Sequence, residues 1–227
     1  MSNICTLFGE KTLISLGYNC FPKRIIDNVL KRKGETNFFD YIGTSMWGIN
    51  DILLNDFENF INLDMYDHID LISNVGKSFV HVDYYVRPFH DLHVNSSTKR
   101  KKDYIDKYLR RQKRLEEYLT SENEIVFIRL QEDMKSRIIH EKYKEKYDIS
   151  EFEHINRFAN IVKTKYNKRN FHIIYLTTGP QKHYEQNNII SIQIPEEVYN
   201  LLKWENVEQH IKTILLDNID YINGIIE

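Results

Sequence analysis

The residue with the clearest potential for chemistry is Cys20, at the end of residues 15–20 (SLGYNC). A β-rich run precedes it and a helical pattern starts at Pro22, so the thiol is expected where a strand gives way to a helix. Backbone N–H groups and the helix dipole at such a point favour an anion, so Gly17 and Asn19 in this connection are candidate substrate- or anion-binding residues. The sequence therefore predicts a thiol with a lowered pKa. The alternative is a buried packing residue.

A thiolate nucleophile requires a base, and the base requires an orienting group. Nine histidines are present. His90 follows a predicted strand and is adjacent to Asp91, while Asp40 lies in the aromatic segment 37–41 (NFFDY). A buried carboxylate needs a partner, which for Asp40 could be a histidine. His90 and His93 could instead indicate zinc, but two distant cysteines do not complete a four-ligand set, so no metal is expected.

A second group of candidates is basic. Residues 99–114 contain nine Lys or Arg against two Asp, and Arg110 and Arg114 are i,i+4 neighbours on a predicted helix with Arg111 beside them. Arg129 ends the strand that follows. Guanidinium groups suit phosphate or carboxylate, so these arginines could converge on an anion site. The alternative is a solvated basic face.

The elements that must position these residues alternate between strand and helix. Strands are expected at 12–16, 78–86, 124–130, 171–177 and 189–194, and helices at 22–33, 47–60, 103–121, 150–166 and 198–222. This order predicts a single α/β domain over residues 1–227. Its sheet would be mainly parallel, with five or six strands and helices on both faces, in a Rossmann-like three-layer arrangement. Ligands of such sheets bind at the carboxyl ends of strands, here residues 17–20, 129–132 and 177–179.

Composition narrows the functional classes. The chain has 227 residues and a formal net charge of −2, so neither nucleic acid nor an anionic membrane is an expected partner. No apolar run approaches the roughly 20 residues of a membrane-spanning helix, and residues 1–11 do not resemble a secretory signal. Two cysteines cannot build a disulfide framework. We therefore expect a reduced, cytoplasmic protein without a cofactor.

The motifs also resemble a known family, the papain-like cysteine peptidases of giant DNA viruses and some bacteria. The resemblance covers roughly residues 12–180 and keeps the family's motif order. An AT-rich codon bias, visible as many Ile, Asn and Lys with a single Ala, suits such a source. The matching segments are residues 15–20 (SLGYNC), 39–41 (FDY, where the family has tryptophan last), 55–57 (NDF), 90–91 (HD), 110–114 (RRQKR) and 127–129 (FIR).

The resemblance implies a cysteine-dependent hydrolase acting on peptides, with Cys20 as the nucleophile, His90 as the base and Asp40 or Asp91 as the orienting carboxylate. It also implies a papain-like α+β fold with an antiparallel barrel, whereas the element pattern favours the parallel sheet. One alternative function is a nucleotide- or phosphate-recognising transferase, for example for sugars, with an arginine-lined site for a small phosphorylated substrate and a structural Cys20. Another is a non-catalytic viral effector that binds a host protein.

Overall fold

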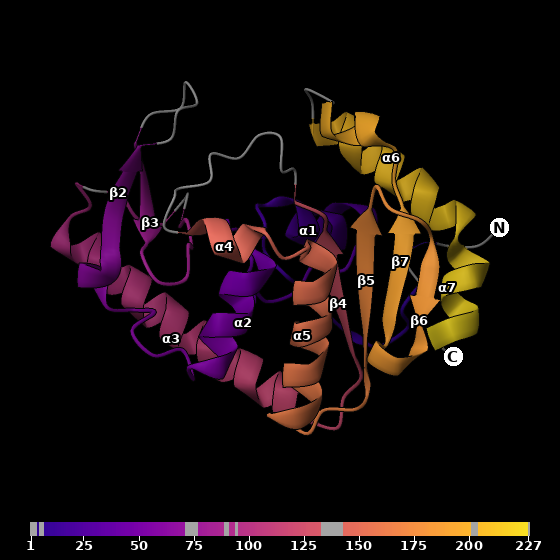
Figure 1. Ribbon diagram of the computed structural model, residues 1–227, viewed down its shortest axis with the longest axis horizontal. Helices are drawn as coiled ribbons and strands as arrows, with labels where there is room; N and C mark the ends of the chain where they lie inside the picture. The colour runs from indigo at the N-terminus through magenta and orange to yellow at the C-terminus, as the bar shows by residue number, and fades with distance from the viewer. Residues whose placement is uncertain are drawn as a thin grey trace.

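The main sheet is the central element of the structure (Figure 1). The computed structural model describes residues 4, 7–70, 77–88, 91–93, 95–132, 143–200 and 204–226. Five strands have the spatial order β1-β4-β5-β7-β6, of which β6 alone is antiparallel to its neighbour. They are β1 (Thr12–Ser15), β4 (Ile125–Leu130), β5 (Phe171–Thr177), β6 (Lys182–Tyr184) and β7 (Ile189–Gln193). The expected α/β class with a mainly parallel sheet is confirmed, and the antiparallel barrel is not the fold.

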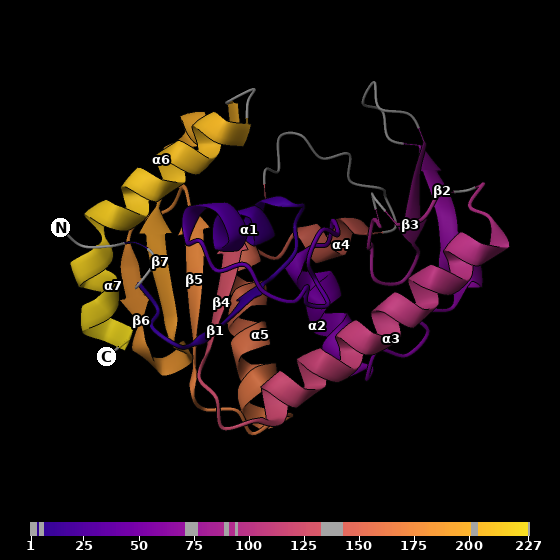
Figure 2. The ribbon, with the colours of Figure 1, turned by 180° about the vertical axis from the view of Figure 1, so that it is seen from behind.

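Helices cover both faces of this sheet. On one face α5 (Glu151–Thr164) packs beside α2 (Met46–Leu54), and α3 (Thr98–Thr120) contributes to the same core cluster. On the other face lie α1 (Phe21–Arg24), its π-helical continuation η2 (Ile25–Val29), α6 (Trp204–Asp217) and α7 (Ile219–Ile226) (Figure 2). The short helix α4 is Lys144–Tyr147. Single 3-10 turns are η3 (Leu63–Met65), η6 (Glu185–Asn187) and η7 (Glu196–Asn200).

The side chains of β4 show why the sheet needs both layers. Ile125 and Phe127 belong to the core cluster beneath α5, whereas Val126 and Ile128 belong to the cluster beneath α6. All six residues of β4 are buried, as expected for a parallel strand covered on both faces.

Several expected elements end earlier than their periodicity indicated, including the following two. The helix expected at 47–60 ends at Leu54, because Asp56, Phe57 and Asn59 adopt positive φ angles that a helix cannot accommodate. The strand expected at 78–86 is β3 (Lys77–His81), which pairs antiparallel with the unpredicted β2 (Tyr66–Asp70).

The apolar content of the helices is also limited. In the described ranges, no helix combines the length and the apolar character that crossing a bilayer requires.

Candidate active site

Cys20 lies at the carboxyl end of β1, after a tight connection. Gly17 has a φ of +53°, and a Cβ there would lie 2.4 Å from Cγ2 of Thr44. Tyr18 also has a positive φ, and its N–H donates to the Thr44 carbonyl at 3.1 Å. The close contact with Thr44 therefore requires glycine at position 17 and fixes the chain that leads to Cys20.

The helix that follows Cys20 differs from the one expected. It has four α-helical residues before the π-helical turn, Pro22 has no N–H, and the N–H of Phe21 donates to Oδ1 of Asn19 at 2.7 Å. Cys20 is half-buried, and loss of hydration raises the pKa of its thiol above the ordinary value, with Arg24 acting in the opposite sense. The expected lowering of the thiol pKa is wrong in direction, because desolvation outweighs the nearby positive charge.

Asp40 joins the segments on either side of Cys20. Its carboxylate is fully buried and accepts a hydrogen bond from Ser15 Oγ at 2.5 Å and another from the Asn37 N–H at 2.7 Å. Nζ of Lys23, which is also buried, lies 3.7 Å from the same carboxylate. Burial raises the pKa of Asp40, opposed first by Lys23 and then by the Ser15 hydrogen bond. The partners of the Asp40 carboxylate among the described residues are thus Ser15, Asn37 and Lys23.

Tyr41 and Asp27 complete this neighbourhood. Lys23 forms a second ion pair with Asp27 at 3.0 Å, and the Tyr41 hydroxyl donates to the other oxygen of Asp27 at 3.1 Å. Burial, then Asp27, raises the pKa of Tyr41 to about 12, with smaller contributions from the charges of Asp40 and Cys20. Cys20 therefore lies within electrostatic range of this buried ionic group.

A chain of hydrogen bonds leads from Asp40 to Asp91. Arg111 of α3 is buried, and its Nη1 donates to the Asp40 carbonyl at 3.1 Å and to the Tyr108 hydroxyl at 3.4 Å. The Tyr108 hydroxyl donates to Asp91 at 3.2 Å, and Lys107 pairs with the other Asp91 oxygen at 2.6 Å. Asp40, through its main-chain carbonyl, and Asp91, through its carboxylate, thus belong to one polar network.

His90 lies outside the described residues. The described residues on either side of it are anchored near the segments above. Arg87 exchanges two backbone hydrogen bonds with Gly43, at 2.8 and 2.9 Å, and Asp91 is held by Tyr108. His93 is exposed.

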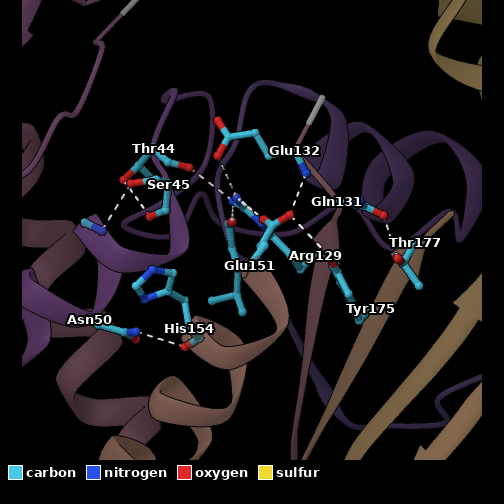
Figure 3. Close-up of polar contacts among 12 residues, drawn as sticks. Thr44, Ser45, Asn50, Arg129, Gln131, Glu132, Glu151, His154, Tyr175 and Thr177 are labelled. Atoms are coloured by element: carbon cyan, nitrogen blue, oxygen red, sulfur yellow. Dashed lines mark hydrogen bonds and ion pairs between the residues drawn. The ribbon is translucent and has the colours of Figure 1, made fainter. Parts of the chain in front are cut away.

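A second polar cluster surrounds Arg129, whose side chain is fully buried at the end of β4 (Figure 3). Nε and Nη2 donate to one oxygen of Glu151 at 2.8 and 2.6 Å. Nη1 donates to the carbonyl oxygens of Leu16 at 2.5 Å and Thr44 at 3.1 Å. The other Glu151 oxygen accepts from the Glu132 N–H and the Tyr175 hydroxyl. Arg129 therefore joins the connection before Cys20 to the start of α5.

A cavity of about 510 Å³ adjoins this cluster, at the carboxyl ends of β4 and β5 where ligands were expected. Polar side chains from the strand ends and the start of α5 line one part, including Glu132, Glu151 and Thr177. The aromatic part of the lining consists of Trp47, Tyr147, Phe152, Tyr175 and Tyr184. Cys20 is not among the described residues that line it.

His154 of α5 also lines the cavity and was not predicted. Its Nε2 lies 3.0 Å from the Lys146 carbonyl, which can only accept, so Nε2 carries the hydrogen and Nδ1 has the lone pair. Burial lowers the pKa of His154. A capping box, in which Ser150 and Glu153 bond each other's backbone N–H, starts this helix. That motif predicted the helix, but no pattern distinguished Glu151 or His154 as site residues.

The predicted basic residues have separate partners. Arg110 is exposed, Arg111 contacts Asp40 as described, and Arg114 pairs with Glu35 at 2.7 Å and donates to the Thr36 carbonyl at 2.5 Å. Arg129 uses its three nitrogens on Glu151 and two carbonyls. These contacts do not bring Arg129 together with Arg110 or Arg111 at an anion site, as had been expected. Arg111 and Arg129 are instead buried and hold backbone segments in place.

Comparison with known families adds one finding. A model of the family described as putative papain-like cysteine peptidase matches residues 11–179, more than half of the chain. No curated protein and no solved structure matches the chain.

Proposed function

The chain belongs to the putative papain-like cysteine peptidase family, and on that premise we propose that it is a cysteine-dependent hydrolase that cleaves peptide bonds through Cys20. Cys20 is the nucleophile and His90 the base. Asp40 and Asp91 are positioning residues, one for the segment that carries each partner.

The observation that carries this proposal is the placement of Asp40. Its carboxylate binds Ser15, five residues before Cys20, and Lys23, three residues after it. Burying a carboxylate costs folding free energy unless the carboxylate is paired. Asp40 is therefore expected to contribute more than stability at this position. These contacts fix the backbone on both sides of Cys20, and a nucleophile must be held in such a fixed geometry to react.

The placement of the described neighbours of His90 supports its role as base. Arg87 pairs with Gly43, whose neighbour Thr44 accepts the Tyr18 N–H two residues before Cys20. His90 lies three residues after Arg87 in the sequence and directly before Asp91. Asp91 is itself held by Lys107 and Tyr108.

In the reaction, the proton of the Cys20 thiol passes to the His90 imidazole as Sγ attacks the carbonyl carbon of the peptide. The C–N bond then breaks, the imidazolium returns its proton to the departing amine, and a thioester remains. Water attacks the thioester while His90 removes its proton, which releases the acid and restores the thiol. Because burial raises the pKa of Cys20, the base must act during attack; little thiolate is formed beforehand at neutral pH.

The cavity beside Arg129 is the proposed position of a part of the substrate away from the scissile bond, because Cys20 is not among the described residues that line it. Its volume of about 510 Å³ lies within the range of small-ligand pockets. Arg129 links Glu151, which lines the cavity, to the carbonyls of Leu16 and Thr44. These two carbonyls belong to the segments that hold the residues leading to Cys20 in place. A peptide in the cavity would therefore lie against the same framework as the thiol.

The test is cleavage of a peptide mixture prepared from a digested proteome, with new termini identified by mass spectrometry. We expect the purified protein to produce a reproducible set of new termini and a Cys20→Ala variant of equal stability to produce none. A Cys5→Ala variant is the matched control and should cleave as the unmodified protein does. Equal cleavage by the Cys20→Ala variant would overturn the proposal.

A further inference from the structure

The C-terminal helices lie outside residues 11–179, to which the family match extends, yet α6 contacts η2, the continuation of the helix that begins after Cys20. Buried residues of α6, including Val207 and Ile211, share a core cluster with Ile25 and Ile26 of η2. Figure 2 shows α6 crossing the same face of the sheet as α1. This segment is therefore part of the surroundings of Cys20.

Polar contacts to Glu208 also join α6 to α1 and η2. Oε1 of Glu208 on α6 accepts from Nε and Nη2 of Arg24, both at 2.6 Å, and from Asn28 Nδ2 at 3.0 Å. Both charged side chains are partly buried, with 16% of Glu208 and 30% of Arg24 exposed. Such a two-nitrogen contact on one carboxylate oxygen holds the guanidinium in a defined position.

Arg24 is also close to Cys20 along the helix, since its backbone N–H donates to the Cys20 carbonyl at 3.1 Å. It lies one helical turn after the thiol and favours the thiolate, against the effect of burial. Other charged or titratable groups of this neighbourhood are Lys23 on α1, Asp27 on η2, and Asp40 and Tyr41 from the segment that pairs with them. Among these groups, Arg24 is the one that Glu208 contacts.

We propose that Glu208 is a positioning residue for the Cys20 centre, which holds Arg24 against α6 and so limits the positive charge that reaches the thiol. The C-terminal helix thereby restrains the reactivity of Cys20. The functional meaning of this inference rests on the proposed role of Cys20, but its test reads the thiol directly and needs no substrate.

The experiment measures alkylation of Cys20 by iodoacetamide near neutral pH in the full chain, by peptide mass spectrometry, with Cys5 as the internal reference. Glu208→Gln keeps the shape and removes the charge, so Arg24 loses the negative charge of this partner. Half a pKa unit changes the thiolate fraction about threefold. We expect Cys20 to react about threefold faster in this variant, while Cys5 is unchanged.

A control and a double mutant separate this mechanism from a general charge effect. Glu205→Gln removes the same charge from an exposed position one turn earlier on α6 and should leave the Cys20 rate unchanged. Arg24→Gln should slow alkylation, and adding Glu208→Gln to it should have no further effect, because Glu208 acts through Arg24.

Two results would overturn the inference: an unchanged rate in Glu208→Gln, or the same acceleration by Glu208→Gln when Arg24 is already replaced. If Cys20→Ala still cleaves peptides, the hydrolase proposal fails, while the alkylation result stands or falls separately. Arg24→Gln keeps the test valid even if Glu208→Gln loosens α6.

Discussion

Two buried arginines, Arg111 on α3 and Arg129 on β4, both hold backbone segments in place, but their surroundings differ. Each donates to backbone carbonyls near Cys20, Arg111 to Asp40 and Arg129 to Leu16 and Thr44. Arg129 is also paired with Glu151 and adjoins a cavity. The described hydrogen bonds of Arg111 go instead to a carbonyl and a tyrosine hydroxyl within the core.

The difference between the two surroundings indicates the structural role of each arginine. A guanidinium that is buried and donates to carbonyl oxygens holds the backbone segments that carry those carbonyls. Arg129 fixes the loop on the side where a cavity is open, and Arg111 fixes the opposite side, where the core is closed. The candidate site is therefore an open pocket with a rigid frame on both sides.

The largest expected effect is the loss of Arg129. Arg129→Met would leave the Glu151 carboxylate partly buried without its cation, and breaking a buried pair in this way costs about 3–5 kcal/mol of unfolding free energy. Urea denaturation measures the loss. The matched control is Arg110→Met, an exposed arginine that should change stability by about 0.5 kcal/mol or less. Equal losses in the two variants would contradict the anchoring role.

A smaller loss is expected for Arg111→Met. No carboxylate bonded directly to Arg111 is stranded, but the Asp40 carbonyl loses its donor, at a cost of about 1–3 kcal/mol. The same denaturation experiment ranks the two variants. A loss equal to or larger than that of Arg129→Met would show that the closed network, and not the ion pair beside the cavity, is the stronger anchor.

The two regions should also respond to pH with opposite signs. The folded-state pKa of Asp40 is raised, so its contribution to stability is greatest below the unfolded value of about 3.9 and is lost as the pH rises through the folded pKa. The folded-state pKa of His154 is lowered, so its contribution is lost as the pH falls from about 6.5 through the folded pKa.

Difference measurements test these signs. The stability of the unmodified protein relative to Asp40→Asn should fall with rising pH, and that relative to His154→Gln should fall with falling pH. Parallel curves for either pair would mean that the group does not titrate differently in the folded and unfolded states.

The smallest expected effect is at the edge of the cavity. Tyr175→Phe removes one hydrogen bond to Glu151, with an oxygen–oxygen distance of 3.3 Å, and should cost about 0.5–1 kcal/mol because Arg129 still holds the carboxylate. A loss as large as that of Arg129→Met would mean that Tyr175, not Arg129, keeps Glu151 in place.

The sequence predicted the elements whose signals are local. The apolar runs of β4, β5 and β7 and the Ser150 capping box were sufficient for the sheet and α5, and the position of Cys20 after β1 followed from them. The burial of individual side chains could not be predicted from local patterns in the same way. The desolvation of Cys20 and the burial of Arg111 depend on segments that are distant in the sequence. The spacing of the charges therefore predicted that Arg111 binds a ligand, whereas in the structure it is buried and holds a backbone segment.

Glu151 and His154 illustrate the remaining gap. Both lie in the first turn of a predicted helix, where an acidic residue normally serves the helix dipole. Only the parallel register of β1 with β4 brings Arg129 next to the Leu16 carbonyl and makes Glu151 its partner.

The most direct test of the account is the pH dependence of Cys20 alkylation, between about pH 5.5 and 9.5, in the unmodified protein and in His90→Ala. If His90 removes the thiol proton, the rate in the unmodified protein should rise with an inflection near the histidine value of about 6.5. The His90→Ala variant should lose that inflection and react only as the thiol itself ionises, above its ordinary pKa because the site is partly buried. Identical profiles, each with a single inflection above the ordinary thiol value, would contradict a Cys20–His90 pair.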